Sequence, residues 1–306
     1  MKKLIRGAVV GLVAALTLSA CGGGDSGDDN PLAGGGAGGT VTVGGANFPE
    51  SNLLAELYAQ ALEAKGVKVT RKFNIGAREV YYDQVVKGGI SVMPEYNGAL
   101  LVTSVDENSK AATTEEINAE LKSKLPASVE MLASAEAEDK DSVTVNPQTA
   151  AKHDLKSIAD LEGVAKDLVI AGPSEFETRQ QGLKGLKEAY GIEFKEFKPF
   201  DAGAQSTLVK LLVEDEIQAA DLFTTDPTIE QNKLVVLEDP KNVFNAQNVT
   251  PLVHKESVDQ TARAALDAVS AKLTTQDLLD MMKRVVIDKD DQEKVAEDWL
   301  KKSGLV

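Results

Sequence analysis

The sequence predicts an α/β protein with two lobes and a ligand cleft between them. In two separate stretches, residues 41–101 and 168–239, short apolar runs alternate with helical patterns. That order is typical of mostly parallel sheets with helices on their faces. A chain of 306 residues is long enough for two such domains. Residues 40–142 with 249–306 form the first predicted lobe and residues 143–248 the second, so we expect a hinge where the chain crosses.

The first residues predict export. Lys2, Lys3 and Arg6 form a positive region before the apolar stretch Gly7–Leu18, which is too short to span a bilayer core of ~30 Å. Small residues then precede Cys21, the single cysteine of the sequence. This pattern resembles a bacterial lipobox, which implies removal of a signal peptide, residues 1–20, and lipidation of Cys21.

An ordinary signal peptide followed by an incidental cysteine would produce the same positive and apolar regions. We favour a lipoprotein because an unpaired cysteine has no disulfide role in an exported protein. Residues 21–39 are rich in Gly and Asp and too poor in apolar side chains to fold, so they predict a flexible tether. The expected location is the outer face of the cell membrane.

The first lobe begins with alternating strands and helices. Ser51 is expected to cap the first helix and Gly66 to end it, while Pro94 is expected to close a strand because it lacks a ladder donor. The predicted elements are strand Val41–Gly44, helix Ser51–Lys65, strand Val67–Phe73, helix Ala77–Lys87 and strand Ile90–Met93.

Ligands bind such sheets beyond the carboxyl ends of the strands. The loops that follow the three strands fall at that edge, and the last of them offers a carboxylate, an aromatic ring and an amide. A polar turn after an edge strand would have the same composition. The candidate ligand-binding residues here are Asn47, Phe48, Gly76, Arg78, Glu95, Tyr96 and Asn97.

The rest of the chain repeats this plan and then closes with helices. Thr113 or Thr114 is expected to cap a helix to Leu125, and Thr275 to cap one of the three final helices. The other predicted elements are strands 142–146, 168–172, 194–200, from 219, and 234–239, and helices 149–153, 182–190, 205–215, 257–273, 275–286 and 290–302. The candidate ligand-binding residues are Ser174, Glu175, Phe176, Arg179, Phe223, Thr224, Thr225, Asp226, Gln247 and Asn248.

From Val41 onward the chain resembles the substrate-binding proteins of ABC importers for glycine betaine, choline and related osmoprotectants. The resemblance implies a two-lobed periplasmic-binding-protein fold of type II, with two crossovers. It also implies capture of a small solute such as glycine betaine, choline or carnitine, and delivery to a membrane permease and its ATPase. The matching stretches are residues 73–80, 91–101, 157–164, 171–201, 223–229 and 234–244.

The resemblance also implies roles for individual residues. Tyr96 matches a ring of the cage that holds a quaternary ammonium by cation–π attraction, and Phe223 stands where a second ring is frequent. Arg179 matches an arginine that meets a ligand carboxylate. The sequence departs from the family at Ala99, at 141–143 and at 246–248, where Thr and further aromatic residues are usual. Rings from another direction would come from Tyr81, Tyr82, Phe48 or Phe176.

Two alternatives follow from these departures. The amides of Asn245, Gln247 and Asn248 would suit a more hydroxylated or non-quaternary ligand. A surface sensory or adhesion lipoprotein with the same fold would need no transported solute.

Other functional classes fit less well. A net charge of −15 argues against nucleic-acid binding, which needs a basic face. His153 and His254 lack metal-type partners at useful spacing, and the sequence contains no catalytic motif, so we expect no enzyme, cofactor or metal site. Glu95 with Asp226 or Glu175 reads as polar lining rather than an acid–base pair.

Overall fold

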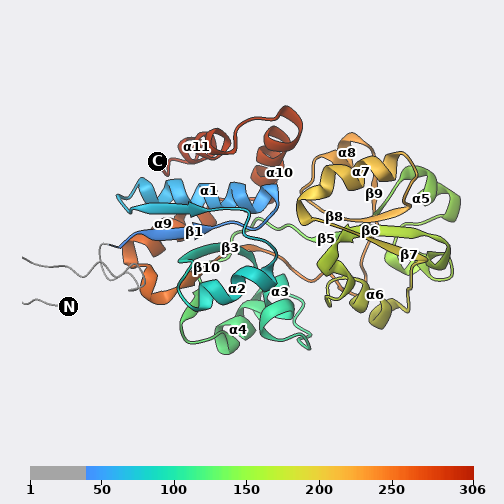
Figure 1. Cartoon of the computed structure of the whole chain (residues 1–306), viewed down its shortest axis with the longest axis horizontal. Coiled ribbons are helices and arrows are strands. Elements are labelled where there is room, and N and C mark those ends of the chain that lie inside the picture. The colour runs from blue at the N-terminus through green and yellow to red at the C-terminus, as the bar shows by residue number, and fades with distance from the viewer. Residues whose placement is uncertain (1–38) are drawn as a thin grey trace, which may run out of the picture. The chain divides into compact units, whose positions relative to one another are not determined.

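The computed structural model of the chain describes residues 39–306 (Figure 1). The predicted signal peptide, Cys21 and nearly all of the predicted tether lie outside these residues. Within residues 39–306, no helix combines the length and the apolar character needed to cross a bilayer. The rest of the chain builds two five-stranded sheets, each with helices on its faces. The predicted α/β fold class is therefore confirmed.

The first sheet has the strand order β2-β1-β3-β10-β4. Its first three strands are parallel, whereas β10 runs antiparallel to both β3 and β4. The strands are β1 (Val41–Gly44), β2 (Val69–Lys72), β3 (Val92–Tyr96), β4 (Val129–Met131) and β10 (Val249–His254).

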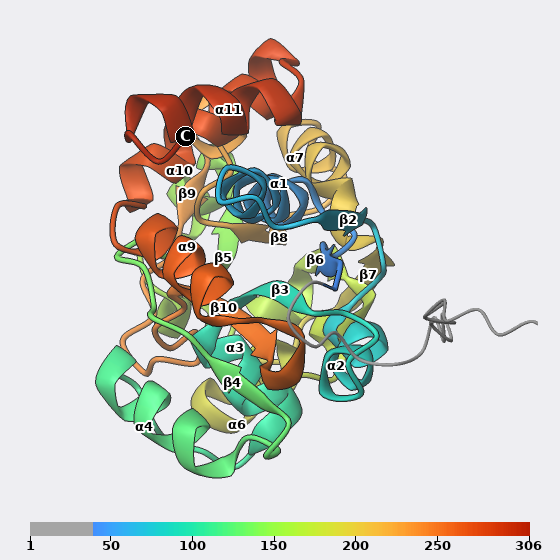
Figure 2. The same cartoon turned by 90° about the vertical axis from the view of Figure 1, so that its left-hand side faces the viewer.

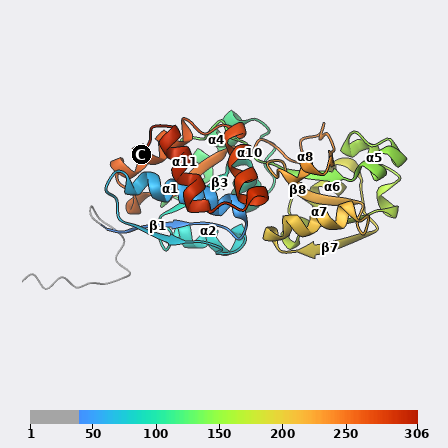
Figure 3. The ribbon, with the colours of Figure 1, turned by 90° about the horizontal axis from the view of Figure 1, so that it is seen from above.

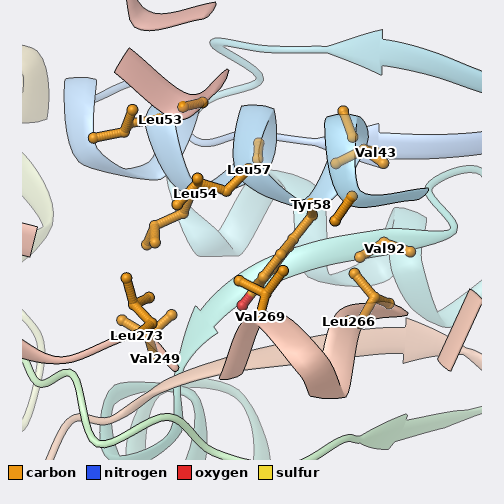
Figure 4. Packing of buried hydrophobic residues seen from close by; sticks show 14 of the residues in the cluster. Val43, Leu53, Leu54, Leu57, Tyr58, Val92, Val249, Leu266, Val269 and Leu273 are labelled. Atoms are coloured by element: carbon orange, nitrogen blue, oxygen red, sulfur yellow. The ribbon is translucent and has the colours of Figure 1, made fainter. Parts of the chain in front are cut away.

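Helices from both ends of the chain cover this sheet (Figure 2). On one face, alternate residues such as Val43 and Val92 pack against α1, α9, α10 and α11, with Tyr58 pointing from α1 toward α9 (Figure 4). On the other face, α2, α3 and α4 pack on Met93 and Leu252. The helices are α1 (Pro49–Glu63), α2 (Arg78–Val86), α3 (Asn97–Leu100), α4 (Thr114–Lys124), α9 (Gln260–Ser270), α10 (Thr275–Lys283) and α11 (Gln292–Lys302).

The second sheet has the strand order β7-β6-β8-β5-β9. It repeats the plan of the first, because β7, β6 and β8 are parallel while β5 runs antiparallel to β8. Buried side chains of α6 pack on one face and those of α7 on the other. Figure 3 shows both helices beside this sheet. The elements are β5 (Asp141–Val145), α5 (Pro147–His153), β6 (Val169–Pro173), α6 (Leu183–Tyr190), β7 (Glu196–Phe200), α7 (Gln205–Val213), β8 (Ala219–Phe223), α8 (Thr228–Gln231) and β9 (Val235–Val236).

Two connections join the sheets. The chain leaves the first sheet after β4 and enters the second at Asp141, and it returns after β9 to begin β10 at Val249. Hydrogen bonds hold both connections: Asp139 on the first accepts from Thr224 and Thr225 after β8, and the side-chain amide of Asn248 on the second donates to the carbonyl oxygen of Ala135 on the first.

The end of β3 differs from the prediction. Pro94 does not close the strand, which continues to Tyr96 and passes directly into α3 and a π-helical turn, Leu101–Val105. The reason lies in the register, since Pro94 stands opposite Pro251 of β10. The carbonyl oxygen of Pro251 points away from β3 and accepts a hydrogen bond from Leu132 on the β4 side. Pro94 and Pro251 are therefore a non-hydrogen-bonded pair of the antiparallel ladder, and the missing N–H of Pro94 leaves no acceptor on β10 unpaired.

The residues that cap the helices were predicted less accurately than the positions of the helices. Phe48 precedes α1, Pro49 occupies its first turn, and the hydroxyl of Ser51 instead accepts a hydrogen bond from the backbone amide of Ala46 at 2.9 Å. Thr274 rather than Thr275 caps α10. Thr113 caps α4 in a capping box with Glu116, as one of the two predicted caps. The strand predicted over 234–239 is confined to Val235–Val236.

Candidate functional site

A cavity lies where the carboxyl ends of β1, β3, β6 and β8 come together. Its empty volume is about 640 Å³, which includes its opening to solvent. Both sheets and both connections contribute to its walls. The lining residues are Ala46, Asn47, Phe48, Ala77, Arg78, Tyr81, Tyr96, Ala99, Asp139, Asp141, Pro173, Glu175, Phe176, Arg179, Gln181, Ala202, Asp221, Phe223 and Gln247.

Aromatic rings from the two lobes meet at this cavity. The ring of Phe48, after β1, lies 5.3 Å from that of Phe223 at the end of β8, measured between centroids. The ring of Tyr96, at the end of β3, lies 6.3 Å from that of Phe48. Neither pair is coplanar, so the three rings present differently angled faces and edges to the space they line.

Glu50 fixes the orientation of Tyr96. The Tyr96 hydroxyl donates a hydrogen bond of 2.6 Å to Glu50 at the start of α1. Thr225, from the second lobe, donates to the other oxygen of the same carboxylate. Burial raises the pKa of Glu50, against the lowering effect of these hydrogen bonds. Glu50 therefore joins the first helix, the aromatic wall and the second lobe.

Arg78 lines the cavity but is already paired. Its Nε lies 3.1 and 3.0 Å from the two carboxylate oxygens of Glu95, and its Nη2 lies 2.8 Å from the second of them. Tyr81 donates a further hydrogen bond of 2.9 Å to Glu95, which is fully buried. A carboxylate with this many donors is satisfied by the protein itself.

Three aspartates give the cavity an acidic wall. Asp139 lies on the first connection, Asp141 begins β5, and Asp221 lies in the middle of β8. Burial raises the pKa of Asp139 and of Asp221 well above the usual range, with the charges of Glu50 and Asp141 respectively adding to the effect. Burial also raises the pKa of Asp141, which accepts a hydrogen bond of 3.3 Å from Gln247. Buried carboxyls of one sign favour a bound positive charge.

Arg179 reaches the opposite lobe. It donates two hydrogen bonds, of 3.0 and 2.9 Å, to the carboxylate of Glu79 on α2. Glu175, one turn earlier, lies 3.9 Å away. The guanidinium therefore makes a two-pronged contact across the cavity mouth, with Glu79 occupying the place that the resemblance assigns to a ligand carboxylate.

Nine of the predicted ligand-binding residues line the cavity together: Asn47, Phe48, Arg78, Tyr96, Glu175, Phe176, Arg179, Phe223 and Gln247. Phe176 also packs on Phe244 at 6.4 Å between centroids, so it belongs to the core of the second lobe as well. Tyr81, considered as an alternative ring, lines the cavity too. Eight predicted residues do not line it.

Those eight residues hold the walls from behind or lie beside the cavity. In the first lobe, Glu95 pairs with Arg78, and Gly76 stands in the loop before α2 with a φ of 121°. The side-chain oxygen of Asn97 accepts hydrogen bonds from the backbone amides of Gly98 and Asn248, both at 2.8 Å. The Asn97–Asn248 contact therefore ties the end of β3 to the second connection.

The remaining four belong to loops of the second lobe. The exposed Ser174 donates to the carbonyl oxygen of Phe200. Thr224 and Thr225 bond to Asp139, and Asp226 accepts two hydrogen bonds from Thr228 at the start of α8. These contacts order the loop after β8, which positions Phe223.

Sequence reasoning missed the acidic wall and Gln181. Asp221 carried a signal that was available, because it is a charged residue inside the otherwise apolar run Ala219–Phe223. Asp139 and Asp141 carried a weaker one, since residues two apart in an extended chain share a face. Within residues 39–306, no cluster of His, Cys, Asp and Glu has the arrangement of a metal site.

Known proteins resemble this chain over most of its length. It is 26% identical to the glycine betaine-binding protein YehZ of Escherichia coli over 276 residues, which cover 86% of this chain and 90% of that protein. It is 27% identical to a glycine-betaine-binding protein of Pseudomonas aeruginosa, covering 87% and 89%.

Solved structures show the same fold. A glycine betaine/carnitine/choline ABC transporter structure matches with a TM-score of 0.67 at 20% identity, over 87% of this chain and 99% of that one. A choline-binding protein in complex with choline matches with a TM-score of 0.65 at 18% identity, over 87% and 89%. The likeness to these structures confirms the fold that the resemblance predicted.

One family description accounts for almost all of the described residues. The family of the substrate-binding domain of the ABC-type glycine betaine transport system matches residues 39–302. The cavity, with walls from both lobes, is the feature that a solute-capturing protein needs. The chain belongs to this family and is a substrate-binding protein of an ABC importer.

Proposed function

We propose that the chain captures a small cationic or zwitterionic amine of the osmoprotectant class in the cavity between its lobes. Glycine betaine, choline and carnitine represent this class. The observation that carries the proposal is the meeting of Phe48, Tyr96 and Phe223 beside an acidic wall. Aromatic faces attract a desolvated cation by about 0.5 to 2 kcal/mol per ring, and nearby carboxyls add a longer-range attraction.

The two lobes close on the solute and present it to the permease and its ATPase. The lobes are residues 40–142 with 249–306, and residues 143–248, and the two connections serve as the hinge. Contacts such as Arg179 to Glu79 and Asn47 to Asp201 join the lobes around the cavity. A ligand that touches both walls favours the closed arrangement because it binds that arrangement better.

The chain acts at the outer face of the membrane, anchored by a lipid on Cys21. Support comes from the positive and apolar residues before Cys21 and from the Gly- and Asp-rich segment that follows it. Membership of an importer family agrees with this location.

The amides that suggested a hydroxylated ligand are engaged by the protein. Asn245 accepts from Gln181 and donates to the carbonyl oxygen of Ala111, and Gln247 donates to Asp141. Asn248 accepts from Thr114 and donates to the backbone. These contacts leave the aromatic and acidic walls as the stronger recognition surface.

Thermal unfolding tests the proposal. The full chain in detergent is heated with glycine betaine, choline, carnitine or ethanolamine, and with a neutral polyol as control. A solute at 100 times its dissociation constant should stabilise the protein by about 2.7 kcal/mol. Tyr96→Ala should abolish the shift, whereas Tyr82→Ala, outside the cavity lining, should keep it. No shift with any amine at millimolar concentration would overturn the proposal.

A further inference from the structure

Asp221 is a buried acid that faces the cavity without a partner. It is 1% exposed and lies in the middle of β8, between β6 and β5. Neither of its carboxylate oxygens makes a hydrogen bond of normal geometry within the described residues. Burial is the largest cause of the raised pKa of Asp221 and the charge of Asp141 is the next, whereas an interaction with the backbone amide of Ser142 lowers that pKa by less. An ionised carboxylate has about four sites that accept hydrogen bonds, and burial removes water from them.

The fold makes room for this acid. An ideal Cβ at Gly172 on the neighbouring β6 would lie 2.9 Å from the Cβ of Asp221, closer than side-chain carbons approach. Glycine at this position therefore lets the aspartate stand between the two strands at the cavity wall. Strand β8 is otherwise apolar at its buried positions, so Asp221 is a local exception in a well-packed sheet.

The two arginine side chains that line the cavity make their hydrogen bonds with other carboxylates, not with Asp221. Arg78 makes three contacts with Glu95, and Arg179 makes two with Glu79. Asp139 accepts from Thr224 and Thr225, and Asp141 accepts from Gln247, so these acids have protein donors. Asp221 is thus the one acid of the three-aspartate wall, among the described residues, that makes no hydrogen bond of normal geometry.

Charge and hydrogen bonding make different demands on a ligand. A quaternary ammonium satisfies the aromatic rings and the charge of the wall, but it has no N–H group to give to a carboxylate. A protonated primary or secondary amine supplies both the charge and the donors. Water competes more strongly for the amine, which favours the quaternary ligand at an aromatic surface alone. Here burial has already removed water from Asp221, so the donor meets an acceptor with no competing partner.

We propose that this cavity prefers a small cation that retains N–H groups over its fully methylated counterpart, with Asp221 accepting the hydrogen bond. The inference rests on the proposed function, because it names the chemical class of the amine that the same cavity captures. Phe48, Tyr96 and Phe223 contact the carbon atoms of the ligand. Asp221 distinguishes ligands by the number of methyl groups on their nitrogen, because only a nitrogen that retains an N–H group donates a hydrogen bond to its carboxylate. A buried acceptor left without its donor is a stronger basis for discrimination than the loss of a methyl contact.

A methylation series measures this preference. Calorimetry on the full chain in detergent compares ethanolamine, N-methylethanolamine, N,N-dimethylethanolamine and choline. A charge-assisted hydrogen bond predicts that ethanolamine binds about 10- to 100-fold more tightly than choline. Asp221→Asn should reduce that ratio to about threefold or less, because the ligand change and the residue change act on the same bond.

Controls separate the possible failures. Asp167→Asn, an exposed aspartate of the same lobe, should leave the series unchanged. If choline is the tightest ligand of the series, or if Asp221→Asn leaves the ratio intact, the preference for N–H cations is wrong while capture of an amine stands. If no member of the series and neither glycine betaine nor carnitine binds, the proposed function itself fails and the inference fails with it.

Discussion

Arg78 and Asp221 are both buried charged side chains in the lining of one cavity, and the protein treats them in opposite ways. Arg78, from the first lobe, has a full partner in Glu95, with Tyr81 adding another hydrogen bond to the same carboxylate. Asp221, from the second lobe, has no such partner among residues 39–306. A buried charge with a hydrogen-bonded partner of opposite charge is part of the structural framework. A buried charge without such a partner lowers the stability of the unliganded protein, and a ligand that supplies the partner restores that stability.

Breaking the completed pair should have the largest effect. Arg78→Met leaves Glu95 buried with the Tyr81 hydroxyl and a backbone amide as its remaining donors, and should lower the free energy of unfolding by about 3–5 kcal/mol. Chemical denaturation measures this cost. The double variant Arg78→Met with Glu95→Gln should be much closer to the natural protein, since it leaves no uncompensated charge. Equal costs for the single and double variants would contradict this account.

Filling the space beside Asp221 should have the next largest effect. Gly172→Ala places a Cβ against that of Asp221, and overpacking of this kind costs about 1–3 kcal/mol. The strands β6 and β8 must separate, so amine affinity should fall as well. Gly89→Ala, where a Cβ would meet its nearest neighbour at an ordinary 3.5 Å, serves as the control in denaturation and calorimetry. A Gly172→Ala protein as stable as the natural one would show that the contact is easily relieved.

Replacing the unpartnered carboxylate of Asp221 by a neutral amide should stabilise the unliganded protein. Burial raises the pKa of Asp221, and Asp141, Glu175 and Arg179 are the charged groups that face it. Between the pKa of an unfolded aspartate, ~3.9, and this raised value, the folded state binds more protons than the unfolded state. The contribution of Asp221 to stability therefore falls as pH rises through that window.

The pH dependence gives that prediction its measurement. Asp221→Asn should gain about 1 kcal/mol over the natural protein at pH 8, and the gain should shrink as the pH falls toward 4. Thermal or chemical unfolding at several pH values, without ligand, records the difference between the two proteins. A gain that grows on acidification would have the wrong sign and would mean that Asp221 is satisfied in the folded state.

The contact between Arg179 and Glu79 should matter least for stability. Glu79 is half exposed, and pairs of this kind contribute about 0–1 kcal/mol and weaken with salt. If the pair holds the lobes together, Arg179→Ala and Glu79→Ala should weaken glycine betaine and choline by similar factors, about fivefold or less. A loss confined to Arg179→Ala and to glycine betaine would instead support the role that the resemblance implies, contact with a ligand carboxylate.

Several of the predicted site residues that the structure brings to the cavity lie at or near strand ends. Asn47 and Phe48 lie in the loop that follows β1, and Tyr96 and Phe223 are the last residues of β3 and β8. Parallel strands bring those ends to one edge. Polar residues in the same loops were harder to assign, because Asn97, Asp226 and Asn248 form local or cross-connection hydrogen bonds instead. A sequence does not show whether a polar side chain points toward a ligand or toward its own backbone.

The sequence by itself determined the α/β fold, the repeated strand–helix plan, the two crossings and the family, because periodicity, order and matching stretches are properties of one dimension. Only the tertiary structure decided which buried charged side chains have a hydrogen-bonding partner within the protein. The partners of Arg78 and Arg179 are separated from them by 17 and 100 residues, and the space for Asp221 comes from Gly172 on a neighbouring strand. Satisfaction of a buried charge depends on every donor that the fold brings near it, so it becomes visible only when distant segments are packed together.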